Sequence, residues 1–201
     1  MSIDITNFNY NRKGLGLKNL ILIIGFLILS NTLYSQKKPV SIWGIEYGAS
    51  QETVEEEVKK YNLEYKSNPN VLICVNAQIF GENARIIGFQ FHENKLYKVI
   101  AAITPASTND IFDSYNKLKS RLTAKYGRAN YVEEIYDPPY EATDTIPVKV
   151  RALEEERLML ISKWTFKDES NALYSMMLTI NEKPEIIISY RDERIDAIVE
   201  E

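Results

Sequence analysis

The chain has 201 residues, which is enough for one domain of ordinary size or for two small fused units. Its 45% hydrophobic and 26% charged residues are typical of globular proteins and exclude wholesale disorder. The formal net charge of −4 and the lack of a basic cluster argue against nucleic acid or an anionic membrane surface as a partner.

Residues 1–36 have the pattern of a signal peptide. Three basic residues, the last of them Lys18, precede the apolar run 20–29, which as a helix would span roughly 15 Å, about half of a bilayer core. Polar residues 30–36 follow, and Ser35 suits the position before a cleavage site. We predict export to the periplasm or the extracellular space, with no stable membrane insertion after cleavage; the alternative is an uncleaved anchor.

The exported part is predicted to be one domain, residues 37–201, with 21 basic and 27 acidic side chains and a net charge of −6. Cys74 is the only cysteine, so this part has no internal disulfide, and its core must supply the stability. Because Cys74 lies within the apolar run 71–75, we expect a small buried side chain. A reactive or intermolecular thiol is the alternative.

The first helix is predicted from residue 51. Ser50 is a suitable N-cap, and apolar side chains recur at Val54, Val58 and Tyr61 with helical spacing. Acidic residues occupy the early turns and lysines the last turn, which complements the helix macrodipole.

The second helix is predicted to begin at Ser107 and to end at Gly127. Asp110 follows Ser107 by three residues, as in a capping box, and glycine suits the left-handed conformation that closes many helices. Its apolar stripe consists of Ile111, Tyr115, Leu118, Leu122 and Tyr126.

Six strands are predicted in two groups of three, each group following one helix. Alternating apolar residues and short polar turns indicate antiparallel neighbours. The six ranges are 71–80, 85–92 and 96–104, then 158–167, 173–180 and 185–190.

The order helix, three strands, helix, three strands forms an internal repeat over residues 41–104 and 105–192. Helices on one face of an antiparallel sheet give a two-layer α+β sandwich, the predicted fold class. One helix and one meander could not bury both apolar faces, so we expect the two halves to share a core or an extended sheet. Residues 128–157 are predicted to be a long loop.

This arrangement resembles the β-lactamase-inhibitory-protein-like fold, and its single unit is similar to small outer-membrane assembly lipoproteins. Residues 44–50 (GIEYGAS) followed by Val54 are similar to the opening motif of such domains, and residues 125–127 (KYG) to a closing motif. The resemblance covers roughly residues 41–192. It implies binding of other proteins or assistance in envelope assembly, with no catalytic residues to transfer.

No residue is predicted to be catalytic, cofactor-binding or metal-binding. His92 is the only histidine and lies in a polar hairpin end, away from the apolar run of Cys74, so a Cys–His dyad is disfavoured. The acidic runs 55–57 and 154–156 are typical of solvated faces. A hydrolytic enzyme that uses carboxylates is kept as an alternative function.

The predicted loop is the candidate binding region. Tyr131, Tyr136 and Tyr140 lie in it beside a pair of prolines, and tyrosines on a stiffened loop give contact area at low entropic cost. We predict a non-catalytic exported module that binds a protein or peptide of the cell envelope through these tyrosines. The loop could also be a mobile insertion with residues 146–151 as an edge strand, and a further alternative function is a carbohydrate or small-ligand binder using Trp43 and Trp164.

Overall fold

The computed structural model describes residues 42–199. The predicted signal peptide, residues 1–36, lies outside this range. Among the described residues no helix is both long enough and apolar enough to cross a membrane.

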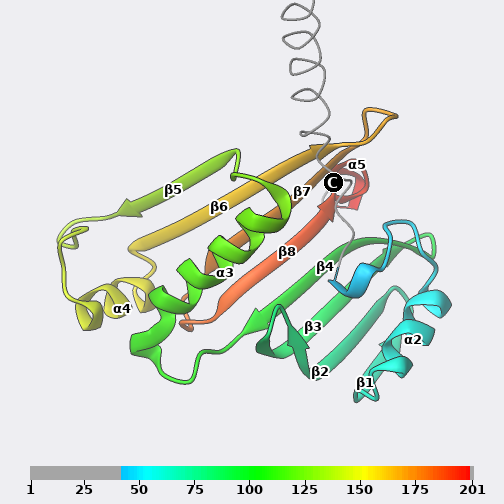
Figure 1. Cartoon of the computed structure of the whole chain (residues 1–201), viewed down its shortest axis with the longest axis horizontal. Coiled ribbons are helices and arrows are strands. Elements are labelled where there is room, and N and C mark those ends of the chain that lie inside the picture. Colours follow the sequence, from blue (N-terminus) through cyan, green and yellow to red (C-terminus); the bar gives the residue numbers. More distant parts are fainter. Residues whose placement is uncertain (1–41, 200–201) are drawn as a thin grey trace, which may run out of the picture. The chain divides into compact units, whose positions relative to one another are not determined.

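Eight strands form a single antiparallel sheet (Figure 1). Across the sheet they lie in the order β1-β2-β3-β4-β8-β7-β6-β5, so β1 and β5 are its two edges. The strands are β1 (Tyr65–Asn68), β2 (Val71–Ile79), β3 (Glu82–His92), β4 (Lys95–Ile103), β5 (Tyr131–Tyr136), β6 (Leu158–Lys167), β7 (Leu173–Ile180) and β8 (Ile186–Asp192). The α-helices are α2 (Gln51–Lys60), α3 (Ile111–Tyr126), α4 (Ile146–Glu154) and α5 (Glu193–Val199), and the 3-10 helices are η1 (Ile42–Gly44) and η2 (Thr108–Asp110). The predicted α+β class is confirmed.

The sheet consists of two similar halves joined at their last strands. α2 precedes β1 to β4, α3 precedes β5 to β8, and β4 pairs with β8 at the centre of the sheet. Residue Ile100 lies opposite Ser189 in this central pair. The predicted shared sheet is therefore present, and each half contains one strand more than the three that the sequence indicates.

α2 begins as the sequence predicts. The Ser50 hydroxyl accepts a hydrogen bond from the Thr53 backbone N–H at 3.2 Å, which satisfies one of the free donors of the first turn. Val54 and Val58 are buried against the sheet. Residues ahead of α2 pair with β4, since the Gly48 N–H donates to the Leu96 carbonyl at 2.8 Å.

α3 covers the second half of the same sheet face. Its predicted stripe is buried from Ile111 to Tyr126, and the Tyr115 hydroxyl lies 2.9 Å from the Ser162 hydroxyl of β6. Gly127 follows with φ of 85°, a conformation that favours glycine. The buried side chains of the helices and of this sheet face form one hydrophobic cluster.

The predicted long loop, residues 128–157, is wrong. Residues 131–136 form edge strand β5, and residues 146–154 form helix α4, which starts after Thr145 with Pro147 in its first turn. The alternative edge strand at 146–151 is also wrong, because these residues are helical. Proline suits the first turn of a helix, where a backbone N–H has no partner to lose.

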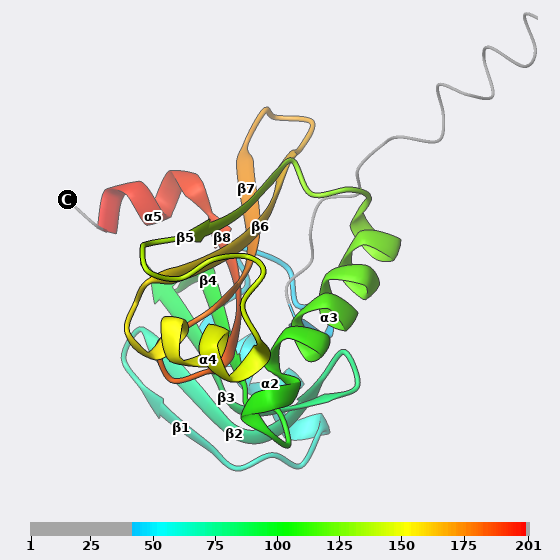
Figure 2. The ribbon, with the colours of Figure 1, turned by 90° about the vertical axis from the view of Figure 1, so that its left-hand side faces the viewer.

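α5 is a short helix that the sequence analysis does not predict. It follows β8 directly and lies on the side of the sheet opposite α3 (Figure 2). Its Asp196 is buried and forms ion pairs with Lys98 of β4 at 2.9 Å and Arg191 of β8 at 3.0 Å. α5 is therefore attached across the seam between the two halves.

Cys74 is a buried core residue, as predicted. It lies on β2 opposite Ile87, on the face covered by the helices. Burial raises the pKa of its thiol to about 12, so the thiol stays protonated at neutral pH. Trp164 of β6 is also fully buried, and its indole N–H donates to the Gly127 carbonyl at 2.8 Å.

Candidate protein-binding surface

The sheet face opposite α2 and α3 is named the open face. The registers of neighbouring strands place its side chains in rows that run across the whole sheet. One row is Ile73, Gly88, Ile100, Ser189, Met177, Lys163 and Tyr131. The next is Val75, Ile86, Ala102, Ile187, Thr179, Ile161 and Glu133.

Half of the side chains of these two rows are large, apolar and partly exposed. Isoleucine, valine or methionine supplies seven of the fourteen positions, and each of the seven is intermediate in exposure. A β-carbon added at Gly88 would meet no heavy atom within 4 Å, which leaves a shallow gap between Ile73 and Ile100. Glycine inside a strand often marks a place where another molecule approaches the backbone closely.

Exposed apolar side chains are concentrated at the β5 end of the molecule. Nine large hydrophobic or aromatic side chains of residues 42–199 are exposed, and six of them lie between residues 131 and 159. Tyr131, Ile135 and Met159 share the open face, where Ile135 lies directly opposite Met159. Single exposed apolar residues are ordinary on protein surfaces, whereas a contiguous group marks an interaction site.

The three tyrosines predicted to bind a partner do not share one environment. Tyr131 is 47% exposed on the open face, and its hydroxyl donates to Glu133. Tyr136 and Tyr140 are only partly exposed and pack against the core cluster. Tyr136 belongs to strand β5 and not to a loop, whereas Tyr140 lies in the irregular segment between β5 and α4, and both side chains are held by packing.

Hydrogen bonds to acidic residues hold Tyr136 and Tyr140 in place. The Tyr136 hydroxyl donates to Glu134 at 2.5 Å, and burial together with this bond raises its pKa. The Tyr140 hydroxyl donates to Glu155 at 2.7 Å. Their position assigns them first to the attachment of β5 and α4; a role in binding stays a prediction.

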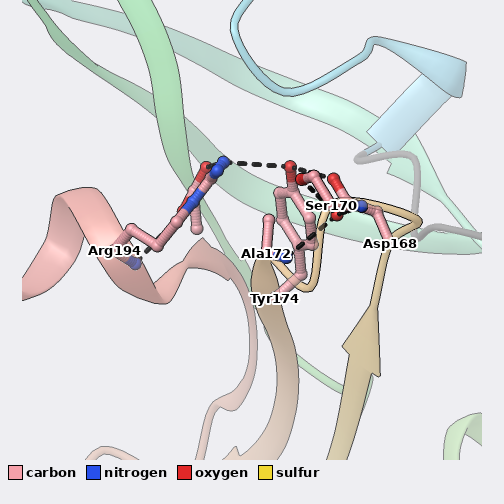
Figure 3. Close-up of polar contacts among 6 residues, drawn as sticks. Asp168, Ser170, Ala172, Tyr174 and Arg194 are labelled. Atoms are coloured by element: carbon pink, nitrogen blue, oxygen red, sulfur yellow. Dashed lines mark hydrogen bonds and ion pairs between the residues drawn. The ribbon is translucent and has the colours of Figure 1, made fainter.

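A chain of polar contacts ties the β6–β7 turn to α5 (Figure 3). One oxygen of Asp168 accepts hydrogen bonds from the Ser170 and Ala172 backbone N–H groups, both at 2.9 Å, and its other oxygen accepts from the Tyr174 hydroxyl at 3.2 Å. The bond from the Ser170 hydroxyl, followed by the backbone bonds, lowers the pKa of Asp168 to about 2. The carboxylate is therefore ionised at neutral pH and stabilises the turn.

Arg194 of α5 completes this chain. Its guanidinium forms a forked ion pair with the buried carboxylate of Asp192, at 3.0 and 2.6 Å, and also donates to the Tyr174 hydroxyl at 3.1 Å. Forked arginine–carboxylate pairs fix geometry as well as charge. The arrangement anchors α5 and the turn. A carboxyl that acts as a general acid at neutral pH needs a raised pKa, whereas the pKa of Asp168 is lowered.

The other candidate site residues considered in the sequence do not come together in the structure. Cys74 pairs with Ile87, and His92 lies five residues farther along β3, roughly 16 Å at the usual strand rise. Trp43 stacks on Tyr61 with ring centroids 4.8 Å apart, so one face of its ring is covered. Within residues 42–199 no group of three or more His, Cys, Asp or Glu residues is placed to hold a metal ion.

The residues of the open face have a signal in the sequence that the predicted elements do not reflect. Residues 71–75, 158–161 and 186–188 are apolar at consecutive positions, so both faces of these strands carry apolar side chains. Such runs are typical of strands covered on both sides, yet only α5 lies over the open face among the described residues. Consecutive apolar positions on a sheet with helices on one side therefore predict a docking face.

Comparisons of the chain with protein-family models, with curated proteins and with solved structures find no match. The functional conclusion therefore rests on the geometry of residues 42–199. That geometry offers an aliphatic sheet face, a group of exposed apolar side chains at the β5 end and an edge strand beside them.

Proposed function

We propose that this protein is an exported, non-catalytic module that binds a protein or peptide of the cell envelope through the β5 end of the open face. The observation that carries the proposal is the grouping of Tyr131, Ile135 and Met159 beside the two aliphatic rows. Exposed aromatic, aliphatic and methionine side chains are the usual core of protein-binding surfaces. Export follows from the signal-peptide pattern of residues 1–36.

The resemblance to β-lactamase-inhibitory-protein-like domains belongs to the same proposal. The duplicated order of helix and antiparallel strands supports it, and the implied role in protein binding agrees with the open face. Of the three predicted tyrosines, we assign direct contact to Tyr131. Tyr136 and Tyr140 support this surface by holding β5 and α4 against the core.

Site-specific photocrosslinking in cells of the source organism tests the proposal. A photoreactive amino acid at Met159 should crosslink one recurrent envelope protein, whereas the same probe at Glu56 on the exposed side of α2 should not. The crosslinked partner, once identified, is then purified for affinity measurements. Equal crosslinking at both positions, or none at Met159, would contradict the proposed surface.

Variants of the open face give a second readout. Replacing Ile135 and Met159 together by lysine should weaken affinity for that partner by about tenfold or more, since buried interface side chains commonly contribute over 1 kcal/mol each. Glu56→Lys on α2 is the matched control, because it changes the net charge by the same amount at an exposed position on the sheet face opposite the open face. If the control variant loses as much affinity, the effect is charge alone and the assignment is wrong.

A further inference from the structure

The edge strand β5 has a row of backbone groups with no neighbouring strand. The Asp137 N–H donates to the Arg157 carbonyl at 2.8 Å. Because hydrogen-bonded positions alternate along an antiparallel pair, the residues two, four and six positions before Asp137 also direct their N–H and C=O groups toward β6. The positions between them, Val132, Glu134 and Tyr136, direct theirs away from β6. Within the described residues, β6 is the only strand beside β5.

The side chains of β5 leave this edge open to a strand of opposite charge. Natural edge strands are usually blocked by charged side chains, above all lysine, or by proline, a bulge or short length. β5 spans six residues, YVEEIY, which include neither lysine nor proline, and Tyr131, Val132 and Ile135 are exposed. β-branched and aromatic residues favour extended pairing, so this edge is suited to accept another strand.

The charge around this edge selects the partner. Residues 128–157 contain eight acidic and four basic side chains, a net charge of −4. Glu133 and Glu134 extend from opposite faces of β5, and neither forms an ion pair with a residue of 42–199. Among the described residues they accept side-chain hydrogen bonds from the Tyr131 and Tyr136 hydroxyls alone, so both carboxylates can meet incoming cations.

We propose that β5 binds an extended basic segment of a partner protein, which adds to the sheet as a ninth strand. The inference rests on the proposed binding function and specifies its partner class. Backbone bonds to Val132, Glu134 and Tyr136 would give affinity, and lysine or arginine side chains would pair with Glu133 and Glu134 on the two faces. Apolar residues of the added strand would extend the open face over Ile135.

A synthetic peptide is the direct probe. An N-acetylated, C-amidated heptapeptide of sequence VKKVKKV, which as a strand has lysines on both faces, should bind the folded protein, and its acidic counterpart VEEVEEV should bind at least about tenfold more weakly. Binding of the basic peptide should weaken as salt is raised, because screened charges attract less. Equal affinity for both peptides, or none for either, would overturn the proposal.

A backbone variant separates strand addition from contact by side chains alone. Val132→Pro removes one outward N–H and leaves the bonds to β6 in place, which edge strands tolerate. It should reduce peptide affinity by about tenfold or more, whereas Val132→Ala keeps the N–H and should change affinity by no more than about threefold. Equal binding by the proline and alanine variants would mean that the edge is not used.

A second probe covers the case in which Val132→Pro does not fold. The basic peptide with alternate residues N-methylated lacks donors along one side, and it should bind wild-type protein at least about tenfold more weakly than the unmethylated peptide. Unchanged affinity would overturn strand addition. A wild-type dimer that Val132→Pro converts to a monomer would show that the occupant is a second copy of this chain, which also overturns the proposal.

The peptide experiments and the photocrosslinking experiment can fail independently of each other. If no peptide binds at β5 but a partner is still crosslinked at Met159, the binding module stands and strand addition fails. If neither is seen, both fail.

Discussion

The two edges of the sheet are protected to different degrees. β1 has only four residues, and the Gln51 side chain of α2 donates to its Asn68 carbonyl at 2.9 Å and to the Ser67 hydroxyl at 2.7 Å. Ser67 in turn donates to Glu55. β5 has six residues, and its exposed side chains include Tyr131. The helix of the first half thus covers its edge with polar contacts, whereas among the described residues no side-chain hydrogen bond or ion pair joins α3 to β5.

Only the second half of this duplicated arrangement leaves its edge strand uncovered. Both halves begin with a helix followed by four strands, with α4 inserted after the first strand of the second half, and both bury the leading helix against the same sheet face. An uncovered edge is an aggregation hazard, so natural proteins normally block it. The first half follows this rule at β1. The second half departs from it at β5, beside the exposed apolar group, which fits a surface kept for binding.

The largest expected losses of stability come from two core substitutions, which test whether β5 is uncovered because the second half is poorly packed. Leu72→Ala in β2 and Leu178→Ala in β7 remove the same side chain from fully buried sites of the two halves. Each should lower the free energy of unfolding by roughly 3–5 kcal/mol. We expect similar losses, because the core is one cluster that spans both halves. Chemical denaturation measures both.

The two tryptophans report on the halves separately. Trp43 packs near α2, and Trp164 is buried in β6, so Trp43→Phe leaves a probe of the second half alone. In this background Leu72→Ala should shift the Trp164 transition as much as the circular dichroism transition. If Leu72→Ala does not shift the Trp164 transition, the two halves unfold independently, and the stability of each edge must then be measured separately.

A smaller effect is expected at the seam between the halves. Lys98 and Arg191 lie opposite each other in the β4–β8 pair, and the buried Asp196 carboxylate lies between these cations. Asp196→Asn keeps the shape but removes the compensating charge, so we expect a loss of about 2–3 kcal/mol. Glu193→Gln on the same helix is the control, since its pair with Lys163 is more exposed and should contribute under about 1 kcal/mol.

If Asp196→Asn proves neutral, α5 does not hold the seam, and the two halves are joined by strand pairing alone. Thermal and urea unfolding of both variants distinguish these cases. An unchanged hydrogen-exchange pattern at β4 and β8 would lead to the same conclusion.

A third prediction makes the β1 edge more like the β5 edge. Gln51→Ala removes both side-chain bonds to β1 and should cost about 0.5–1.5 kcal/mol. Backbone amides of β1 should also exchange faster with solvent than in wild type. Glu56→Ala, at an exposed position of the same helix, should stay within about 0.5 kcal/mol. Equal effects of the two substitutions would mean that Gln51 does not protect this edge.

Helices α2 and α3 and the six longer strands could be predicted because their local signals agree with their burial. Ser50 caps α2 as expected, and the stripe from Ile111 to Tyr126 is buried along α3. Strands β2 and β6 alternate between buried and more exposed positions for most of their length. In each case the apolar period agrees with the burial of one element, although Ser107, predicted to cap the second helix, caps the 3-10 turn η2, and α3 begins at Ile111.

The edges could not be predicted, because an edge strand lacks the burial that creates a pattern. β5 has no fully buried residue, and β1 is four mostly exposed residues. α4 was obscured because its apolar residues also suit a strand and Pro147 resembles a breaker until its place in the first turn is known. The candidate site was found only in part. Tyr131 belongs to it, whereas Ile135 and Met159 became visible once the register placed them on the open face.

The smallest expected effect concerns acid and compares equivalent turns of the two halves. In the first half, Phe80 and Gly81 join β2 to β3 and contain no titratable group. In the second half, Asp168 organises the β6–β7 turn, and its pKa is lowered from the ordinary value to about 2. A carboxyl whose folded pKa is depressed adds stability that is complete above about pH 4 and is lost as the pH falls through about 2.

Asp168→Asn isolates this contribution, because the amide oxygen can still accept bonds from the Ser170 and Ala172 N–H groups while the charge is gone. The wild-type Tm should exceed that of the variant by a constant amount between about pH 5 and pH 7. The difference should shrink as the pH is lowered from about 4 toward 2, since protonation then removes the wild-type charge too. A difference that stays constant down to about pH 2 would show that the turn depends on hydrogen-bond geometry alone, and the acid response would then not distinguish the two halves.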